Sequence, residues 1–345
     1  MNQDLHCHII LLSEHVLVKT TQITNRKQKN NYSLKIYIIN FRFKINQNMK
    51  SVLLFLIFAC FTAKSQQGIL QKTPHDSIHR IFGEGPPVLI INGGPGLNSD
   101  GFADFANDLS KYNFRTIIYD QRGTGRNTID LPDSNNITMD LMVTDIENLR
   151  KKLKIQKWTV LGHSFGGLLA THYLAKHPEN IDKIIFSSSG GVNLRFLHYI
   201  HERINVNLTE AEQDSLVYYQ NNEIPESVRV KKRASFLAKA YVFDKSKSDL
   251  IAERLEQVNF RVNGLVFQDL RKIKFDYTDR FKSLDIPVLV IQGKNDIIST
   301  ETAMEIKNSF GNASLLLLDN CGHYGWLDAR EVYFTSIQKF LHQNQ

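Results

Sequence analysis

The chain has few cysteines and no recognisable metal-binding motif. Its three cysteines are Cys7, Cys60 and Cys321, and only Cys321 lies beyond the N-terminal segment that we expect to be absent from the mature protein. No intramolecular disulfide is therefore expected, so the core has to be large enough to be stable without one. The sequence contains no His-Glu-x-x-His motif and no paired-cysteine site, and it predicts neither a metal nor an organic cofactor.

Surplus charge is also missing from most of the chain. Residues 1–65 contain nine Lys and Arg against two acids, a surplus equal to the net charge of +7 of all 345 residues. Residues 66–345 are therefore neutral overall. This balance gives no electrostatic reason to expect nucleic acid or an acidic membrane surface as a partner.

A signal-peptide pattern lies inside the chain. Met49-Lys50 is followed by an apolar run of about a dozen residues, too short to span a bilayer comfortably, and then by Ala63-Lys64-Ser65. We expect 49–65 to be the signal peptide of a secreted or periplasmic protein, with no stable membrane association after cleavage. Translation is then expected to start at Met49, with 1–48 as a disordered, non-native extension. The alternatives are a short core helix, an uncleaved anchor, or a lipoprotein signal ending at Cys60.

Strands and helices are predicted to alternate from Ile81 onward. Continuous apolar runs indicate buried strands, and helical spacing of apolar residues separates them. The expected strands are 88–92, 114–119, 158–162, 184–186, 287–291 and 314–318, and the expected helices are 102–112, 139–153, 167–177, 300–310 and 331–342. This order predicts an α/β fold with a mostly parallel, doubly wound sheet and helices on both faces.

The alternation stops between 192 and 283. Here we expect only helical segments, at 194–204, 209–220, 227–243 and 248–260. Thr209 and Glu212 have the spacing of a capping box, and Thr138 is expected to cap the earlier helix 139–153. We therefore predict a helical lid at 192–283, inserted into a core made of 66–191 and 284–345.

A serine at the centre of a glycine-rich turn is the strongest chemical motif. Gly162-His163-Ser164-Phe165-Gly166 directly follows the apolar run Trp158-Thr159-Val160. This Gly-x-Ser-x-Gly spacing predicts a strand, a sharp turn and a helix with Ser164 at the apex. Side chains in place of the two glycines would clash with the neighbouring strand and helix.

Serine is a weak nucleophile that needs a base, and the base needs an orienting carboxylate. Asp296 and His323 each follow a later strand, in the order Ser, Asp, His. Both are placed at carboxyl ends of strands, where ligands bind in open α/β sheets. We therefore predict a catalytic triad of Ser164, Asp296 and His323.

Taken singly, Asp296 could be a turn residue and His323 a surface-loop residue. The competing acids Asp319 and Asp328, and the competing histidines His163, His172 and His177, are assigned to packing or to the surface.

The loop Asn92-Gly93-Gly94-Pro95-Gly96 follows the first long strand. Adjacent glycines let the backbone approach a substrate carbonyl, so we predict an oxyanion hole made by the N–H groups of Gly94 and Phe165. A second loop, 120–125, is expected to support the site, with Arg122 available to pair with a carboxylate.

These segments resemble the α/β-hydrolase fold and, within it, the proline iminopeptidase (prolyl aminopeptidase) family. The resemblance rests on Asn92–Gly96, Asp120–Gly125 and Gly162–Gly167 with Asp296 and His323, and it covers about Ile81 to Leu341. The first loop of that family usually begins with His, and Asn92 replaces it here without removing the backbone donor. The resemblance implies a serine aminopeptidase that releases an N-terminal residue, often proline, from short peptides.

The lid departs from this family. Its members hold the substrate amine with lid glutamates, one of them commonly within Glu-Asn-His-Tyr-Phe, whereas the nearest stretch here, Lys239–Phe243, has no carboxylate. The candidate amine-binding acids are Glu223, Glu226, Glu253 and Glu256, which also read as solvated helix faces. The alternatives are therefore an esterase, lactonase or amidase for a small molecule, or an inactive relative that only binds. A dehalogenase or epoxide hydrolase is disfavoured because those enzymes use aspartate at the position of Ser164.

Overall fold

The computed structural model describes residues 79–221 and 223–343. The predicted extension 1–48 and signal peptide 49–65, with Cys7 and Cys60, lie outside the described residues. Within the described ranges, no helix has both the length and the apolar character needed to cross a membrane.

A seven-stranded sheet organises the chain. Its strands are β1 (His79–Phe82), β2 (Pro87–Ile91), β3 (Arg115–Tyr119), β4 (Trp158–His163), β5 (Ile181–Ser187), β6 (Val288–Gly293) and β7 (Ala313–Leu318). The order across the sheet is β1-β3-β2-β4-β5-β6-β7, and every pairing is parallel except that of β1 with β3. The predicted fold class is confirmed. The edge strand β1 was not expected, because four residues carry too short a pattern.

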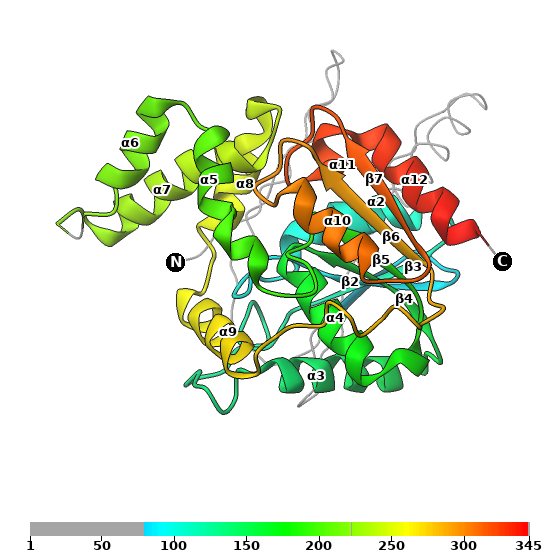
Figure 1. The fold of residues 1–345 in the computed structure, drawn as a ribbon. Helices are drawn as coiled ribbons and strands as arrows, with labels where there is room; N and C mark the ends of the chain where they lie inside the picture. Colours follow the sequence, from blue (N-terminus) through cyan, green and yellow to red (C-terminus); the bar gives the residue numbers. More distant parts are fainter. Residues whose placement is uncertain (1–78, 222, 344–345) are drawn as a thin grey trace, which may run out of the picture. The chain divides into compact units, whose positions relative to one another are not determined.

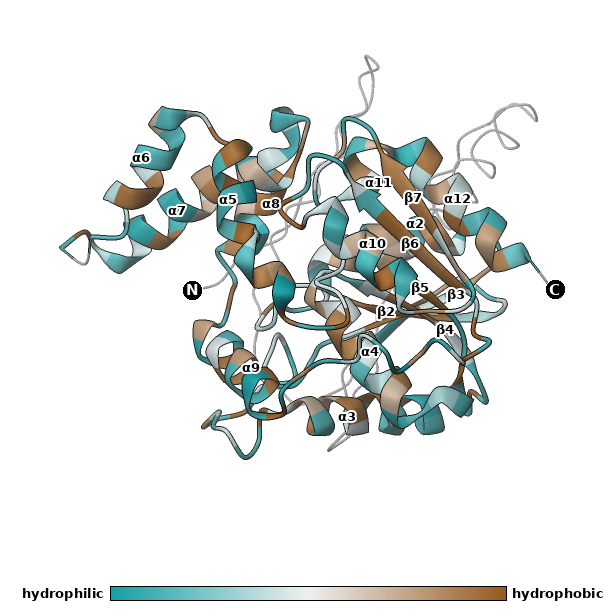
Figure 2. Cartoon of the chain, viewed as in Figure 1, coloured by the Kyte–Doolittle hydropathy of each residue, from teal (hydrophilic) through white to brown (hydrophobic). Residues whose placement is uncertain are grey.

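Helices pack on both faces of this sheet (Figure 1). One face carries α2 (Ala103–Ser110), α11 (Gly325–Asp328) and α12 (Arg330–His342), and the other carries α3 (Met139–Lys152), α4 (Phe165–Lys176) and α10 (Thr300–Asn308). Because side chains alternate along a strand, Val88 and Ile90 join the first core, whereas Leu89 and Ile91 join the second. Figure 2 shows the central strands as predominantly hydrophobic, as burial on both faces requires.

Two local expectations about helix starts have different outcomes. Thr138 caps α3 as predicted, since its Oγ1 accepts the N–H of Leu141 at 3.2 Å. Helix α4 begins at Phe165 rather than at Gly167. The turn at Ser164 is so tight that the helix starts on the very next residue.

The segment 192–283, named the lid segment below, contains α5 (Ile200–Val206), α6 (Glu210–Tyr218), α7 (Glu226–Tyr241), α8 (Ser248–Leu255) and α9 (Phe260–Lys272). The predicted capping box is confirmed, because Thr209 and Glu212 exchange side-chain and backbone hydrogen bonds. The end predicted for the helix 248–260 is wrong, because α8 ends at Leu255. Helix α9 was not predicted, and its N-cap is Asn259.

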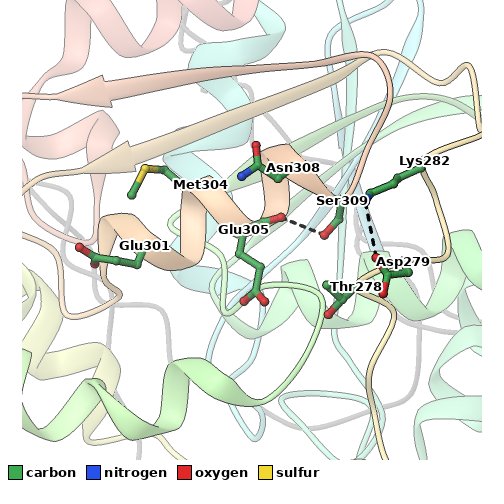
Figure 3. A pocket seen from close by; sticks show the side chains of 8 residues that line it. All are labelled: Thr278, Asp279, Lys282, Glu301, Met304, Glu305, Asn308 and Ser309. Carbon is green, nitrogen blue, oxygen red and sulfur yellow. Dashed lines mark hydrogen bonds and ion pairs between the residues drawn. The ribbon is translucent and has the colours of Figure 1, made fainter.

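The two ends of the lid segment meet beside α10. Tyr277 N–H donates to Val192 O at 2.9 Å, and Asn193 Nδ2 donates to Thr278 Oγ1 at 2.9 Å and to Glu305 Oε1 at 3.0 Å. Figure 3 shows Thr278 and Glu305 on the wall of an open hollow on the outer side of α10. None of the predicted site residues lines this hollow.

Candidate active site

Ser164 stands in a strained turn at the carboxyl end of β4. Its φ of 55° and ψ of −121° are unusual for a residue with a side chain. A Cβ on Gly162 would lie 2.5 Å from Gly166 O, and one on Gly166 would overlap Ile91 O. Both glycines are therefore required by close backbone packing, which lets the chain turn sharply and leaves the Ser164 side chain partly exposed.

Asp296 and His323 form a buried pair. Asp296 follows β6, His323 follows β7, and Nδ1 of the histidine lies 2.7 Å from Oδ1 of the aspartate. Because an ionised carboxylate can only accept, Nδ1 carries the proton and Nε2 is left as a proton acceptor. Ile298 N–H also donates to Oδ1 at 2.9 Å, and His323 N–H donates to Tyr241 O at 2.7 Å. A second hydrogen bond thereby holds the Asp296 carboxylate, and another holds the backbone of His323.

His163 connects this pair to the serine turn. Its ring centroid lies 4.6 Å from that of His323 and 4.9 Å from that of Trp326, and the side chain is 1% exposed. Burial lowers the pKa of His163 well below its ordinary value, and the nearby His323 and Arg254 lower it further. The ring of His163 is therefore neutral, and it contacts both the candidate base His323 and the core residue Trp326. In the chain, His163 directly precedes Ser164.

The loop Gly93–Asn98, named the oxyanion loop below, packs directly on the serine. A Cβ on Gly93 would lie 2.6 Å from Ser164 Cβ and 3.3 Å from its Oγ. Asn92 Nδ2 donates to Leu97 O at 3.1 Å, so the side chain of Asn92 closes the loop.

The two predicted oxyanion donors are available. Within the described residues, the N–H groups of Gly94 and Phe165 donate to no protein oxygen. Gly94 has a φ of +70°, and Phe165 is the first residue of α4, where N–H groups lack intrahelical partners. The arrangement can accept a developing negative charge next to Ser164.

The loop 120–125 holds the residue that follows the oxyanion loop. Asp120 is fully buried, and its carboxylate accepts the N–H of Ser99 at 2.9 Å and the hydroxyl of Ser99 at 2.7 Å. Arg122 pairs with Asp145, at 2.7 Å and 3.0 Å, which raises the cost of using it for a substrate. The sequence suggested such pairing for Arg122, but it did not single out Asp120.

The remaining predicted candidates lie elsewhere. All four glutamates considered for amine binding, Glu223, Glu226, Glu253 and Glu256, are exposed.

The competing acids and histidines have other partners. Asp319 pairs with Lys294 at 2.6 Å, and Asp328 accepts the N–H groups of Phe243 and Gly322. His172 bonds to Asp140 and Tyr277, and His177 lies 3.5 Å from Glu179. Cys321 is a buried free cysteine, and burial raises the pKa of its thiol.

Sequence reasoning missed two residues of the site. Gln292 Nε2 donates to Asp296 Oδ2 at 2.7 Å, and Arg254 of α8 reaches the oxyanion loop. No sequence motif marks either residue. Gln292 lies at the end of a buried strand, and Arg254 is surrounded by charged residues that are typical of a solvated helix face. In the described part of the chain, no group of three or more His, Cys, Asp or Glu side chains could hold a metal ion.

Comparison with known proteins decides the family. The model of the alpha/beta hydrolase fold matches residues 86–329. The chain belongs to the alpha/beta hydrolase fold family. Among solved structures, this alpha/beta hydrolase is similar to an alpha/beta fold family hydrolase from Bacillus anthracis str. Sterne, with a TM-score of 0.64, 21% identity and coverage of 79% of this chain and 99% of the other. An esterase from Exiguobacterium antarcticum has a TM-score of 0.61 at 20% identity, covering 80% and 99%.

Curated relatives of this alpha/beta hydrolase include proline iminopeptidases, so the resemblance stated from the motifs is confirmed. The proline iminopeptidase of Lactobacillus delbrueckii subsp. bulgaricus is 28% identical over 293 residues, which cover 76% of this chain and 92% of the relative. That of Saccharolobus solfataricus is 26% identical over 279 residues, covering 77% and 88%.

Proposed function

We propose that this alpha/beta hydrolase is a serine hydrolase that uses Ser164, His323 and Asp296. The observation that carries the proposal is the buried Asp296–His323 pair beside a strained serine turn. Ser164 Oγ attacks the substrate carbonyl while His323 Nε2 takes its proton, and Asp296 holds the imidazolium. The N–H groups of Gly94 and Phe165 bind the oxyanion, and water then releases the acyl group from the serine.

We propose short peptides with a free N-terminus as the substrates, in a secreted or periplasmic setting. The curated relatives support this substrate class, and the signal-peptide pattern at 49–65 supports the location. A second candidate, an esterase, lactonase or amidase for a small molecule, is favoured by one observation. The candidate amine-binding glutamates of the lid segment are exposed, whereas Arg254, a cation, is buried next to the oxyanion loop.

The serine assignment is tested with Ser164→Ala. We expect turnover of every substrate to fall at least about 1000-fold, because the nucleophile is lost while the hole and the fold remain. Ser215→Ala, in α6, is the matched control and keeps wild-type activity. Retained turnover in Ser164→Ala with an unchanged melting temperature contradicts the triad.

The substrate class is tested by a paired assay on the wild-type protein. Proline and alanine 4-nitroanilides report aminopeptidase activity, and 4-nitrophenyl acetate and butyrate report esterase activity. We expect turnover of the anilides that is lost when the substrate amine is acetylated. Ester turnover without anilide turnover selects the second candidate, and no turnover of either set supports a binding-only relative.

A further inference from the structure

The oxyanion loop is held by the lid segment, at the junction of α8 and α9. Asn259 N–H donates to Gly96 O at 2.9 Å, and Asn263 Nδ2 donates to Pro95 O at 2.9 Å. A Cβ on Gly96 would overlap the Asn259 carbonyl, so the two backbones are in direct contact. The loop that carries the candidate oxyanion donor therefore depends on residues more than 150 positions later in the chain.

Arg254 is the charged member of this junction. Its Nη2 lies 3.4 Å from Gly93 O and its Nη1 lies 3.4 Å from Asn98 O, so the guanidinium spans both ends of the oxyanion loop. The side chain is 7% exposed, and its guanidinium stacks over the Phe102 ring at 4.9 Å. The planar fork of an arginine is suited to such a bridge between two carbonyls.

This buried cation has no acidic partner at close range. Within the described residues, no carboxylate forms an ion pair with Arg254, and the nearby Asp100 is instead paired with Arg80 and Arg126. Burial lowers the pKa of Arg254, yet an arginine stays charged at any physiological pH. Burying a cation without a counter-ion is costly, so a stabilising role alone does not account for it.

The contact with Gly93 O acts on the oxyanion donor itself. The Gly93 carbonyl and the Gly94 N–H belong to one planar peptide group and point in opposite directions. Fixing the carbonyl oxygen therefore fixes where the N–H points. A cationic donor on the oxygen also polarises the amide, which makes its N–H a stronger donor.

We propose that Arg254 is a positioning residue that orients and polarises the Gly93–Gly94 peptide group toward the oxyanion formed at Ser164. This inference rests on the proposed serine hydrolase function and assigns part of the oxyanion hole to the lid segment. Arg254 lies on the carbonyl side of the peptide, so it acts through Gly94 and does not touch the substrate oxygen.

The test compares Arg254→Met, Arg254→Lys and the matched control Arg261→Met, an exposed arginine of α9 bonded to Pro132 O. With a 4-nitrophenyl ester or 4-nitroanilide that the wild type hydrolyses, we expect R254M to lower kcat by about 10- to 100-fold with KM changed less than about threefold. Arg254→Lys recovers part of the loss because it keeps the charge and one hydrogen bond. Arg261→Met stays within about twofold of wild type.

A second readout separates positioning from stability. Phenylboronic acid forms a tetrahedral anion on a reactive serine, and its affinity should fall in R254M by the same factor as kcat/KM. A kcat or boronate affinity of R254M within twofold of wild type overturns the proposal. If R254M does not fold, R254K decides: a kcat lowered more than threefold at constant KM supports the proposal, and an unchanged kcat overturns it. If the wild type hydrolyses none of the substrates, the proposed serine hydrolase function fails. If the wild type is active and R254M keeps its kcat, only the proposed role of Arg254 fails.

Discussion

Gln292 donates a 2.7 Å hydrogen bond from Nε2 to Oδ2 of Asp296, the carboxylate oxygen that His323 does not use. The same amide nitrogen also donates to Ile298 O at 3.0 Å. Both oxygens of the carboxylate thus accept hydrogen bonds. Gln292 is 1% exposed at the end of β6, so no water can readily replace its amide.

Replacing Gln292 with leucine is predicted to weaken catalysis without removing any catalytic group. We expect Gln292→Leu to lower kcat by about 10- to 100-fold, because an aspartate free to rotate misplaces the imidazole. Steady-state kinetics on an ester or anilide measure the effect. Gln268→Leu, on the exposed face of α9, is the control. Wild-type kcat in Gln292→Leu would show that the carboxylate needs no second partner.

Two glycines should respond to alanine in opposite directions. Gly166→Ala is predicted to destabilise the fold by about 3 kcal/mol, because the new methyl group overlaps the backbone oxygen of Ile91. Gly264→Ala is predicted to stabilise it by about 0.5–1 kcal/mol, since the glycine lies inside α9 with nothing within 4 Å of the added Cβ. Urea unfolding of both variants measures the difference, and equal effects would contradict the packing argument.

Glu147 should make stability depend on acid pH. Burial opposes its ionisation, but hydrogen bonds from Arg150 at 2.8 Å and Tyr173 at 2.6 Å outweigh it and lower the pKa of Glu147 from 4.5 to about 2. A carboxylate with a lower pKa in the folded state stabilises the fold above pH 4.5 and loses that contribution as the pH falls toward 2.

The variant Glu147→Gln is therefore expected to be less stable than wild type by about 3 kcal/mol at pH 7. The difference should shrink between pH 4.5 and 2, as measured by denaturant unfolding across that range. Glu84→Gln, on an exposed loop, should track the wild type throughout. A gap that stays constant down to pH 2 would mean that the pKa of Glu147 does not differ between the folded and unfolded states.

The parts of the fold that could be predicted are those with strong local patterns. The buried central strands are continuous apolar runs, and Ser164, Asp296 and His323 each follow one of them. Parallel strands place their carboxyl ends at one edge, so chain order alone brought the candidate site residues to that edge. The caps at Thr138 and Thr209 depend on a few neighbouring residues and were equally readable.

The parts that were missed depend on distant partners or on weak patterns. Strand β1 has four residues, and its pairing with β3 is antiparallel at the edge of the sheet. Helix α9 carries Gly264 in its interior, which lowers its helical signal. Arg254 reads as a surface charge because the carbonyls that bury it, those of Gly93 and Asn98, are about 160 positions earlier.

The meeting of the lid segment's two ends beside α10 has an evolutionary consequence. Because Val192 and Tyr277 are hydrogen-bonded neighbours, changes in the chain between them need not shift the register of β5 against β6. A graft must nevertheless supply its own partners for the carbonyls of the oxyanion loop. The helices α5, α6 and α7 can therefore vary between related chains, whereas the α8–α9 junction has to be inherited together with the core.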